Sequence, residues 1–369
     1  AGQFGKAGDF YTSSDVHAVF GRLLARQFDE MWRVLGSPAT IVLRELGPGR
    51  GLFAQDVLDW SEKKFPEFFR ALRYELVEQS PALRQRIDQT LVRHFQSGKA
   101  TFAKIDRMNA SGASTLAMST TEESATGKST TLVVPNLGPP EAALAAAVPV
   151  LLFANEFFDA VPVEVVSTKG SLRIDARNGQ FVETWAAPSP EELEFLDRYS
   201  IHPEEGERSE VPLQAQQIMS DAAHLHRGFT VVVDYGYTRE EQLAGRHRGT
   251  LKAIRQHSVS ANPYEAPGEQ DITADVNFTA LAAAAERQGM HAHKLVTQSQ
   301  FLMGIGEANQ FADAFEGCRQ PQERAKVALQ LKHLVTPAGM GESFHVLVAS
   351  KGINAEQVSR LAGLCFGRR

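Results

Sequence analysis

The segment 41–51, IVLRELGPGRG, most constrains how this chain can fold. An apolar, β-branched run leads into a loop with glycines at alternate positions, and the helix-forming run 52–60 follows directly. Glycines let the chain turn sharply at a strand end, and they let backbone N–H groups approach a ligand without a Cβ in the way. The segment therefore predicts a strand, a glycine loop and a helix, with a nucleotide-type ligand at the carboxyl end of a parallel strand.

The glycine spacing narrows the choice of ligand. A dinucleotide fingerprint counted from Gly47 requires a third glycine at position 52, where this chain has leucine. A P-loop requires a lysine after its last glycine, and none follows Gly51. Glu45 would repel a pyrophosphate but suits a cationic group. The pattern E-x-G-x-G-x-G therefore favours S-adenosylmethionine, which carries an ammonium and a sulfonium and no phosphate.

A second acid follows the next predicted strand. Residues 73–78, RYELVE, read as a short buried strand that ends at Glu78, and Ser80-Pro81 then begins a helix. In doubly wound nucleotide-binding folds, an acid at the tip of the second strand binds the ribose hydroxyls. We therefore expect Glu78 to bind the ribose of the ligand.

The composition is that of a globular protein. Charged residues make up 22% and hydrophobic residues 43% of the chain. Its length of 369 residues is enough for one large α/β domain or two smaller ones. The net charge of -6 and the lack of a basic stripe argue against a nucleic-acid partner. The two cysteines are far apart, which argues against a disulfide framework or a zinc site. The apolar run 142–154 is too short to span a bilayer.

Helices and strands alternate along the rest of the chain. Helical spacing of apolar residues over 16–35 predicts the first helix. The further predicted strands are 148–154, 163–168, 172–176, 181–185, 230–234, 291–297 and 343–350, and the further predicted helices are 81–95, 190–198, 211–227 and 278–288. This order predicts an α/β fold with a Rossmann-like, doubly wound sheet, an antiparallel β-hairpin insertion and extra helices.

Acidic and aromatic residues follow the fourth predicted core strand. Asn155, Glu156 and Asp159 flank two phenylalanines, and this strand end should lie beside the first one in a doubly wound sheet. Two carboxylates and an amide at that edge could bind a cationic or amide nucleophile and exclude water. We therefore predict that these three residues form the acceptor side of the site.

Six segments in order, GDFYTSS, ELGPGRG, ANEFFDAVPVE, VVDYGY, GTLKAIRQH and PGEQDITADVNF, resemble the MidA-like methyltransferase family over about residues 8–305. The resemblance implies a class I methyltransferase fold with S-adenosylmethionine as cofactor. For the mitochondrial member, which assists assembly of respiratory complex I, it implies symmetric dimethylation of an arginine in a complex I subunit. The family's helical segment before GDF is expected to be missing here.

The resemblance also implies roles for individual residues. The cofactor-binding residues would be Glu45, at the amino-acid end, Gly47, Gly49, Gly51, Glu78, at the ribose, and Thr12 and Ser13, which with Asp9 belong to a loop over the pocket. Asn155, Glu156 and Asp159 would be catalytic. Gln256, His257 and the stretch 271–275 match family motifs without an assigned role, and Asp234 and Tyr235 either hold the fold or border the pocket.

The expected organisation is an N-terminal loop and helix over 1–36 and a methyltransferase domain over 37–369. The domain would carry a low-complexity insert at about 109–131 and a β and helical subdomain at about 163–227. We expect a cytoplasmic protein if the source is bacterial, with the mitochondrial matrix as the alternative.

Three functions remain open from the sequence. The favoured one is a protein arginine methyltransferase acting on a partner protein. The alternatives are a methyltransferase for a small molecule or another side chain, and an assembly factor that binds the cofactor and acts by docking.

Overall fold

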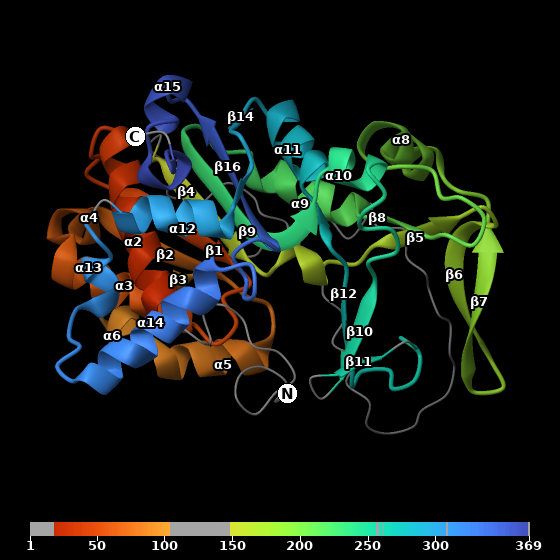
Figure 1. Ribbon diagram of the computed structural model, residues 1–369, viewed down its shortest axis with the longest axis horizontal. Helices are drawn as coiled ribbons and strands as arrows, with labels where there is room; N and C mark the ends of the chain where they lie inside the picture. Colours follow the sequence, from red (N-terminus) through yellow and green to blue (C-terminus); the bar gives the residue numbers. More distant parts are fainter. Residues whose placement is uncertain (1–17, 104–147, 256–257, 261, 308, 368–369) are drawn as a thin grey trace.

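A nine-stranded sheet forms the centre of the molecule. The computed structural model describes residues 18–103, 148–255, 258–260, 262–307 and 309–367 (Figure 1). Across the sheet the strands are β14 (His291–Ala292), β16 (Phe344–Lys351), β9 (Gly228–Tyr237), β4 (Val150–Asn155), β1 (Ile41–Leu46), β2 (Leu72–Val77) and β3 (Ala100–Phe102). In addition, β13 (Val276–Asn277) pairs with β9 and β15 (Val296–Thr297) pairs with β16. The sheet confirms the predicted doubly wound class.

The strand directions bring the carboxyl ends of the parallel strands, and the loops that follow them, to one edge of the sheet. Strands β3, β2, β1, β4 and β9 are mutually parallel, and β16 runs antiparallel to β9. From β1 the chain first builds outward through β2 and β3 and then returns to add β4 on the other side. The carboxyl ends of β1 and β4 therefore flank the point where the strand order reverses, which is where open α/β sheets bind ligands.

Helices cover both faces of the sheet because its strands are apolar on both faces. On one face, α2 (Ala18–Val34), α3 (Leu52–Lys64) and α12 (Gln298–Glu307) contribute to a large buried cluster. On the other face, α9 (Leu213–Ala222) and α11 (Phe278–Arg287) pack over a second cluster. Neighbouring residues of β4 show the alternation, since Leu151 and Phe153 join the first cluster and Leu152 joins the second.

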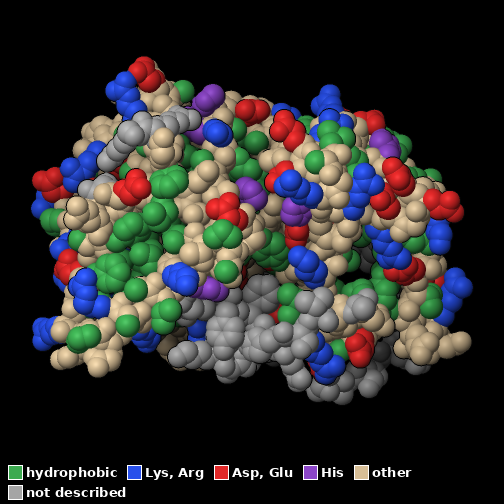
Figure 2. Space-filling view, viewed as in Figure 1, with side chains coloured by type: hydrophobic (Ala, Val, Ile, Leu, Met, Phe, Trp, Pro, Cys, Tyr) green, Lys and Arg blue, Asp and Glu red, His purple; other side chains and the backbone are tan. Residues whose placement is uncertain are grey.

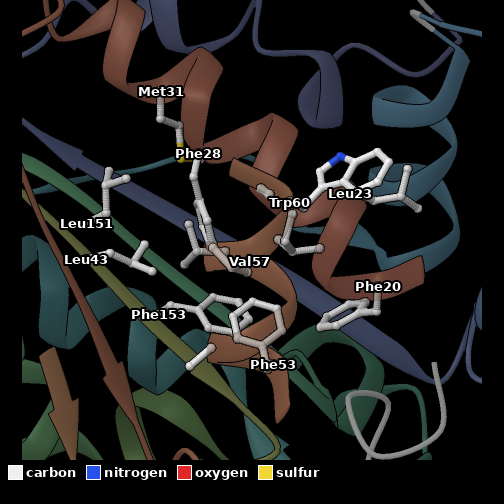
Figure 3. Packing of buried hydrophobic residues seen from close by; sticks show 14 of the residues in the cluster. Phe20, Leu23, Phe28, Met31, Leu43, Phe53, Val57, Trp60, Leu151 and Phe153 are labelled. Carbon is white, nitrogen blue, oxygen red and sulfur yellow. The ribbon is translucent and has the colours of Figure 1, made fainter. Parts of the chain in front are cut away.

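Aromatic rings tie α2 and α3 to the sheet. Phe53 of α3 stacks on Phe153 of β4 with ring centroids 4.5 Å apart, and Phe28 of α2 packs edge-on against Phe153 at 5.6 Å (Figure 3). Phe53 lies just after the glycine loop and Phe153 lies just before the acidic loop. Their contact therefore fixes the two loops relative to each other.

Two smaller sheets extend from the core. The first has the order β7 (Gln180–Ala186), β6 (Gly170–Arg177), β5 (Glu164–Ser167) and β8 (Ser209–Val211), and its β6–β7 hairpin projects at one end of the molecule (Figure 1). Asn178 and Gly179 turn the hairpin with φ of 53° and 75°, as a two-residue turn requires. The second consists of β11 (Ser258–Ser260), β10 (Lys252–Arg255) and β12 (Asp271–Thr273).

The remaining elements are further helices, most of them short. They are α4 (Pro66–Ala71), α5 (Pro81–Thr90), α6 (Val92–Gln96), η1 (Phe158–Ala160), α8 (Pro190–Tyr199), α10 (Arg239–Leu243), α13 (Ala312–Phe315), α14 (Pro321–Val335), α15 (Ala355–Val358) and η2 (Ala362–Leu364). In the described residues no helix is both long enough and apolar enough to cross a membrane. Acidic and basic side chains are interspersed over the face that Figure 2 shows.

Several element predictions differ from the structure in detail. The helix predicted over 81–95 is two helices, α5 and α6, because the backbone leaves helical geometry at Leu91 (φ -105°, ψ 19°). The strand predicted over 291–297 is two short pairings with β16. For 249–275 the sequence predicts a short strand followed by a long polar loop, whereas the structure forms the three strands β10, β11 and β12 within it. No sequence pattern predicted β3 or α4. The insert at 109–131 lies outside the described residues.

Candidate functional site

The glycine loop after β1 adopts the backbone geometry that its sequence predicts. Gly47, Gly49 and Gly51 have φ of 61°, 56° and 78°, a region that side chains with a Cβ rarely occupy. The Gly47 N–H donates to the Val77 carbonyl at the end of β2, and the Gly51 N–H donates to the Pro48 carbonyl. Gly51 is also the N-cap of α3, so the loop delivers the chain directly into the helix.

The outer side of this loop is open. A Cβ placed on Gly49 would meet no atom of the described residues within 4 Å, whereas one on Gly47 would come within 2.7 Å of Phe157 Cδ2. Gly47 therefore packs against the loop that follows β4, and Gly49 has no close neighbour in the described part of the chain. An open, positive-φ glycine at a helix N-terminus suits close approach of a ligand to the backbone.

Glu45 lies beneath this loop and is buried. Its Oε2 accepts a hydrogen bond of 2.7 Å from the hydroxyl of Tyr74 on β2. Burial raises the pKa of Glu45 to about 8, which the Tyr74 hydrogen bond only partly opposes. In the protein without ligand the carboxyl is therefore largely protonated at neutral pH, and a nearby cation would favour its ionised form.

Glu78 follows β2 at the same edge of the sheet. Its Oε1 accepts hydrogen bonds from the backbone N–H groups of Gln79 and Ser80, at 2.8 and 2.7 Å. These two bonds fix the carboxyl orientation. Partial burial raises its pKa, and the two N–H donors lower it. The structure thus places Glu78 where a ribose-binding acid is expected in this fold.

The acidic loop begins at the last residue of β4. Asn155 Nδ2 lies 3.3 Å from Glu156 Oε1, and the Glu156 N–H donates to the Val233 carbonyl of β9. Glu156 has a φ of 48°, which is unusual for a residue with a Cβ. Such backbone strain persists where the surroundings enforce it, and it is common at functional sites.

Asp234, at the end of the buried part of β9, holds this loop in place. Its Oδ2 accepts the backbone N–H groups of Phe157, Phe158 and Asp159 at 3.2, 3.0 and 3.3 Å. Its Oδ1 accepts the N–H of Tyr235 at 3.0 Å. Burial raises the pKa of Asp234, Asp159 and Glu156 raise it further, and the N–H donors lower it.

Asp159 is buried at the centre of the site. Its Oδ2 accepts a 2.7 Å hydrogen bond from the Tyr235 hydroxyl. Its Oδ1 is also buried and has no hydrogen-bond partner in the described part of the chain. Burial raises the pKa of Asp159 to about 6, and the Tyr235 hydroxyl and, more weakly, the backbone N–H groups of Ala160 and Asp159 oppose that rise. A buried carboxylate oxygen without a donor is costly, so this atom marks a place for a ligand donor.

Further charged residues lie behind Tyr235. Lys252 Nζ is 5.5 Å from the centre of the Tyr235 ring and 3.0 Å from Asp275 Oδ1, and Asp275 Oδ2 is 2.9 Å from His247 Nδ1. The Ala274 N–H donates to the Asp159 carbonyl, which brings the loop after β12 next to the acidic loop. The sequence indicated a role for 271–275 only through the family motif. No motif or spacing in the sequence indicated that His247 and Lys252 would lie near the site.

The predicted site residues fall into two groups. The structure brings together Glu45, the three loop glycines, Glu78, Asn155, Glu156 and Asp159 at the carboxyl ends of β1, β2 and β4. Asp9, Thr12, Ser13, Gln256 and His257 lie outside the described residues. Sequence reasoning left Asp234 and Tyr235 undecided, although an acid and a tyrosine directly after the apolar run 229–233 were a usable signal.

Other features of the described chain are weaker candidates for the functional site than the strand ends. A cavity of about 130 Å³ lies beside α12 and η2, away from the strand ends, with His293, Lys294, Gln300 and Ser359 among its lining residues. In the described ranges no three His, Cys, Asp or Glu side chains gather closely enough to hold a metal ion. We therefore place the site at the strand ends, where carboxylates and an open glycine loop converge.

A family model and two named proteins resemble this chain in sequence. The family model described as "Putative S-adenosyl-L-methionine-dependent methyltransferase" matches residues 23–296. A Drosophila melanogaster protein named protein arginine methyltransferase NDUFAF7 homolog, mitochondrial, is 28% identical, covering 97% of this chain and 78% of the relative. The Homo sapiens protein arginine methyltransferase NDUFAF7, mitochondrial, is 25% identical, covering 92% of this chain and 73% of the relative.

A solved structure shows the same fold. A Burkholderia thailandensis protein, described as a likely methyl transferase bound to S-adenosyl-homocysteine, superposes with a TM-score of 0.72 at 23% identity. The match covers 98% of this chain and 85% of that one. Since the family model matches most of the chain, the chain belongs to the MidA-like family of S-adenosylmethionine-dependent methyltransferases.

Proposed function

We propose that this methyltransferase transfers methyl groups to arginine side chains of a partner protein. The observation that carries the proposal is the buried Asp159 Oδ1, which has no donor among the described residues, on the loop that also carries the half-buried residue Glu156. A guanidinium is planar, stays protonated and presents several N–H donors to carboxylates. The relatives named as protein arginine methyltransferases support the same acceptor class.

The cofactor side of the proposed site consists of Glu45, Gly47, Gly49, Gly51 and Glu78. Bound S-adenosylmethionine would supply an electrophilic methyl group on a sulfonium. The acceptor nitrogen would bond to that methyl group as the carbon–sulfur bond breaks and S-adenosylhomocysteine leaves, and a carboxylate of the acceptor side would take the proton that the nitrogen loses. Glu45 would face the ammonium of the cofactor, and Glu78 would accept the ribose hydroxyls. The open side of Gly49 leaves room for the ligand to approach the backbone. Thr12 and Ser13 stay predicted members of this group.

The acceptor side consists of Asn155, Glu156 and Asp159. A protonated guanidinium is a poor nucleophile because its lone pairs are delocalised. Carboxylates that bind two of its nitrogens would draw positive charge toward themselves and leave the third nitrogen richer in electrons. Alignment of that nitrogen with the methyl group is the main task of the protein, and such positioning can lower a barrier by roughly 7–11 kcal/mol at best.

The acceptor protein is proposed to be a respiratory-complex subunit if this chain resembles its mitochondrial relatives in function as well as in fold. The names of the Drosophila melanogaster and Homo sapiens relatives place those proteins in mitochondria. For this chain, a cytoplasmic or a mitochondrial location stays a prediction.

A labelling experiment tests the proposal. The purified chain would be incubated with S-adenosylmethionine carrying a radioactive methyl group and a lysate from a strain that lacks this protein. Labelled protein would then be hydrolysed and analysed for methylated arginine. We expect protein-bound label in methylarginine, strongly reduced but still measurable with Glu156→Gln and Asp159→Asn variants that still bind the cofactor. Label in a small molecule or another residue would refute the arginine assignment, and no transfer at all would favour the docking function.

A further inference from the structure

Tyr235 is in direct contact with the carboxylate that the proposed mechanism uses. Its hydroxyl donates to Asp159 Oδ2 at 2.7 Å, and burial raises the phenol pKa far above its ordinary value. The hydroxyl therefore keeps its proton and acts as a donor at all physiological pH values. The ring is held edge-on against Phe344 of β16, with centroids 5.6 Å apart. This ring contact with β16 thus holds the Tyr235 hydroxyl in position to donate to Asp159.

Asp234 links the backbone at Tyr235 to the backbone at Asp159. One oxygen of its carboxylate accepts the N–H of Tyr235, and the other accepts the N–H of Asp159 together with those of the two residues before it. Asp234 itself is fully buried. Tyr235 and Asp159 are therefore joined twice, once by their side chains and once through this carboxylate. The acidic loop cannot shift relative to β9 without breaking several of these bonds.

This arrangement distinguishes the two oxygens of Asp159. Oδ2 is occupied by a permanent donor, whereas Oδ1 is buried and has no partner among the described residues. An incoming N–H donor can therefore be accepted by Oδ1 without displacing a protein hydrogen bond. A second N–H from the same ligand would need another acceptor, and Glu156 is the carboxylate on the same loop.

We propose that Tyr235 is a positioning residue, which reserves Asp159 Oδ1 for the acceptor, and that Asp234 fixes the backbone on which this assignment depends. The inference rests on the proposed function in that it assumes an acceptor with N–H donors. It goes beyond that function because it assigns roles to two residues of β9 that do not touch the acceptor. Asp159 then binds the acceptor through one oxygen, and Glu156 supplies the second contact.

The charged surroundings of Asp159 determine how this can be tested. In the described part of the chain, the carboxyls of Asp234, Glu156 and Asp275 lie near the Asp159–Tyr235 pair, and Lys252 lies between Tyr235 and Asp275. The Tyr235 hydroxyl lowers the pKa of Asp159 by donating to its charged form. Removal of that hydroxyl should therefore raise the pKa of Asp159.

The test is a double-mutant cycle with Tyr235→Phe and Asp159→Asn. The matched control is Tyr264→Phe, because the Tyr264 hydroxyl also donates to a carboxyl, Glu183 Oε1 at 3.0 Å, but does so on the projecting hairpin. We expect Tyr235→Phe to lower kcat/KM for the acceptor roughly 10- to 100-fold, as loss of a hydrogen bond to a charged group does. Cofactor affinity should not change, and the acidic limb of the pH profile should move to higher pH. Tyr264→Phe should do none of this.

The cycle separates positioning from a general structural role. If Tyr235 acts through Asp159, Tyr235→Phe has no further effect in the Asp159→Asn background. Additive losses in the two backgrounds would overturn the inference. The assay uses whichever acceptor becomes labelled, so a product other than methylarginine would refute the proposed function and leave the cycle interpretable.

A second measurement needs neither acceptor nor cofactor. The protein would be labelled with carbon-13 at aspartate carboxyls, and the Asp159 signal would be identified by its loss in Asp159→Asn. We expect this signal to titrate at higher pH in Tyr235→Phe than in the unmodified protein. An unchanged titration would overturn the inference even if the activity of the variant fell.

Discussion

Gly47 lies directly against the ring of Phe157, so the glycine loop after β1 and the acidic loop after β4 are in van der Waals contact. A Cβ on Gly47 would come within 2.7 Å of Phe157 Cδ2. Phe157 donates its own N–H to Asp234 and stands next to Glu156. The proposed cofactor and acceptor sides are therefore mechanically coupled through one glycine and one ring.

Substitution of Gly47 by alanine should impair both sides. The left-handed backbone, with φ of 61°, disfavours alanine by roughly 1–2 kcal/mol. The new methyl group would also displace Phe157 and the loop that carries Glu156 and Asp159. We expect cofactor affinity, measured by calorimetric titration, to fall on the order of tenfold or more, together with loss of methyl transfer.

The control for that variant is Gly36→Ala, in the turn between α2 and β1. Gly36 has a φ of 85°, and a Cβ there would meet no described residue within 4 Å. It should therefore show the backbone strain as a lower melting temperature while cofactor affinity stays unchanged. Equal loss of affinity in both variants would contradict a specific role for the Gly47–Phe157 contact.

The backbone geometry of the proposed cofactor side could be predicted from the sequence because its determinants are local. An apolar strand, three glycines at alternate positions and a following helix fold the same way wherever they occur, and all three glycines have positive φ. The predicted neighbourhood of β1 and β4 is also confirmed, because doubly wound sheets place those strand ends side by side.

Long-range side-chain contacts were not readable in the same way. The Asp234 carboxylate accepts N–H groups from residues about 75 positions earlier, and the Tyr235–Asp159 bond spans a similar separation. No local pattern specifies such a pair. Likewise Glu45 finds its donor, Tyr74, on the neighbouring strand, and only the parallel register of β1 and β2 brings them together.

Cofactor binding should release protons from Glu45. The buried carboxyl has a pKa of about 8 without ligand, so it is mostly protonated at pH 7. An ammonium placed beside it would favour the ionised form and lower the pKa. We expect affinity for S-adenosylmethionine to rise between pH 6 and 8. Calorimetry at pH 7 in buffers of different ionisation enthalpy should show proton release, and Glu45→Gln should abolish both effects. Proton release that persists in the variant would exclude Glu45 as its source.

Asp159 should make the folded protein less stable as pH rises. Its pKa of about 6 exceeds the ordinary 3.8, so between these values the folded state binds more protons than the unfolded state. Stability from this group is therefore complete below about pH 4 and is lost as pH rises through 6, by about 1–3 kcal/mol. The fall in unfolding free energy between pH 4 and 7 should be smaller in Asp159→Asn by that amount.

The control for this comparison is Asp88→Asn on the exposed side of α5. It should reproduce the pH dependence of the unmodified protein in the same denaturant titrations. Asp159→Asn should at the same time lose most, but not all, of its methyl transfer, so that stability and activity change in opposite directions above pH 6. A pH dependence identical to that of Asp88→Asn would show that Asp159 is not protonated in the folded state.

Glu78 should contribute to cofactor binding through the oxygen that the backbone does not use. Its Oε1 is held by the N–H groups of Gln79 and Ser80, so the carboxyl presents Oε2 in a fixed direction. In Glu78→Gln the amide oxygen can keep both backbone bonds while an NH₂ donor replaces Oε2, which can no longer accept a ribose hydroxyl. Loss of such a charge-assisted bond should weaken S-adenosylmethionine binding about tenfold or more with little change in melting temperature.

The control is Glu194→Gln on the exposed surface of α8, where Glu194 pairs with Arg198. Calorimetric titration of both variants with S-adenosylmethionine decides the point, since equal affinities would remove Glu78 from the cofactor site.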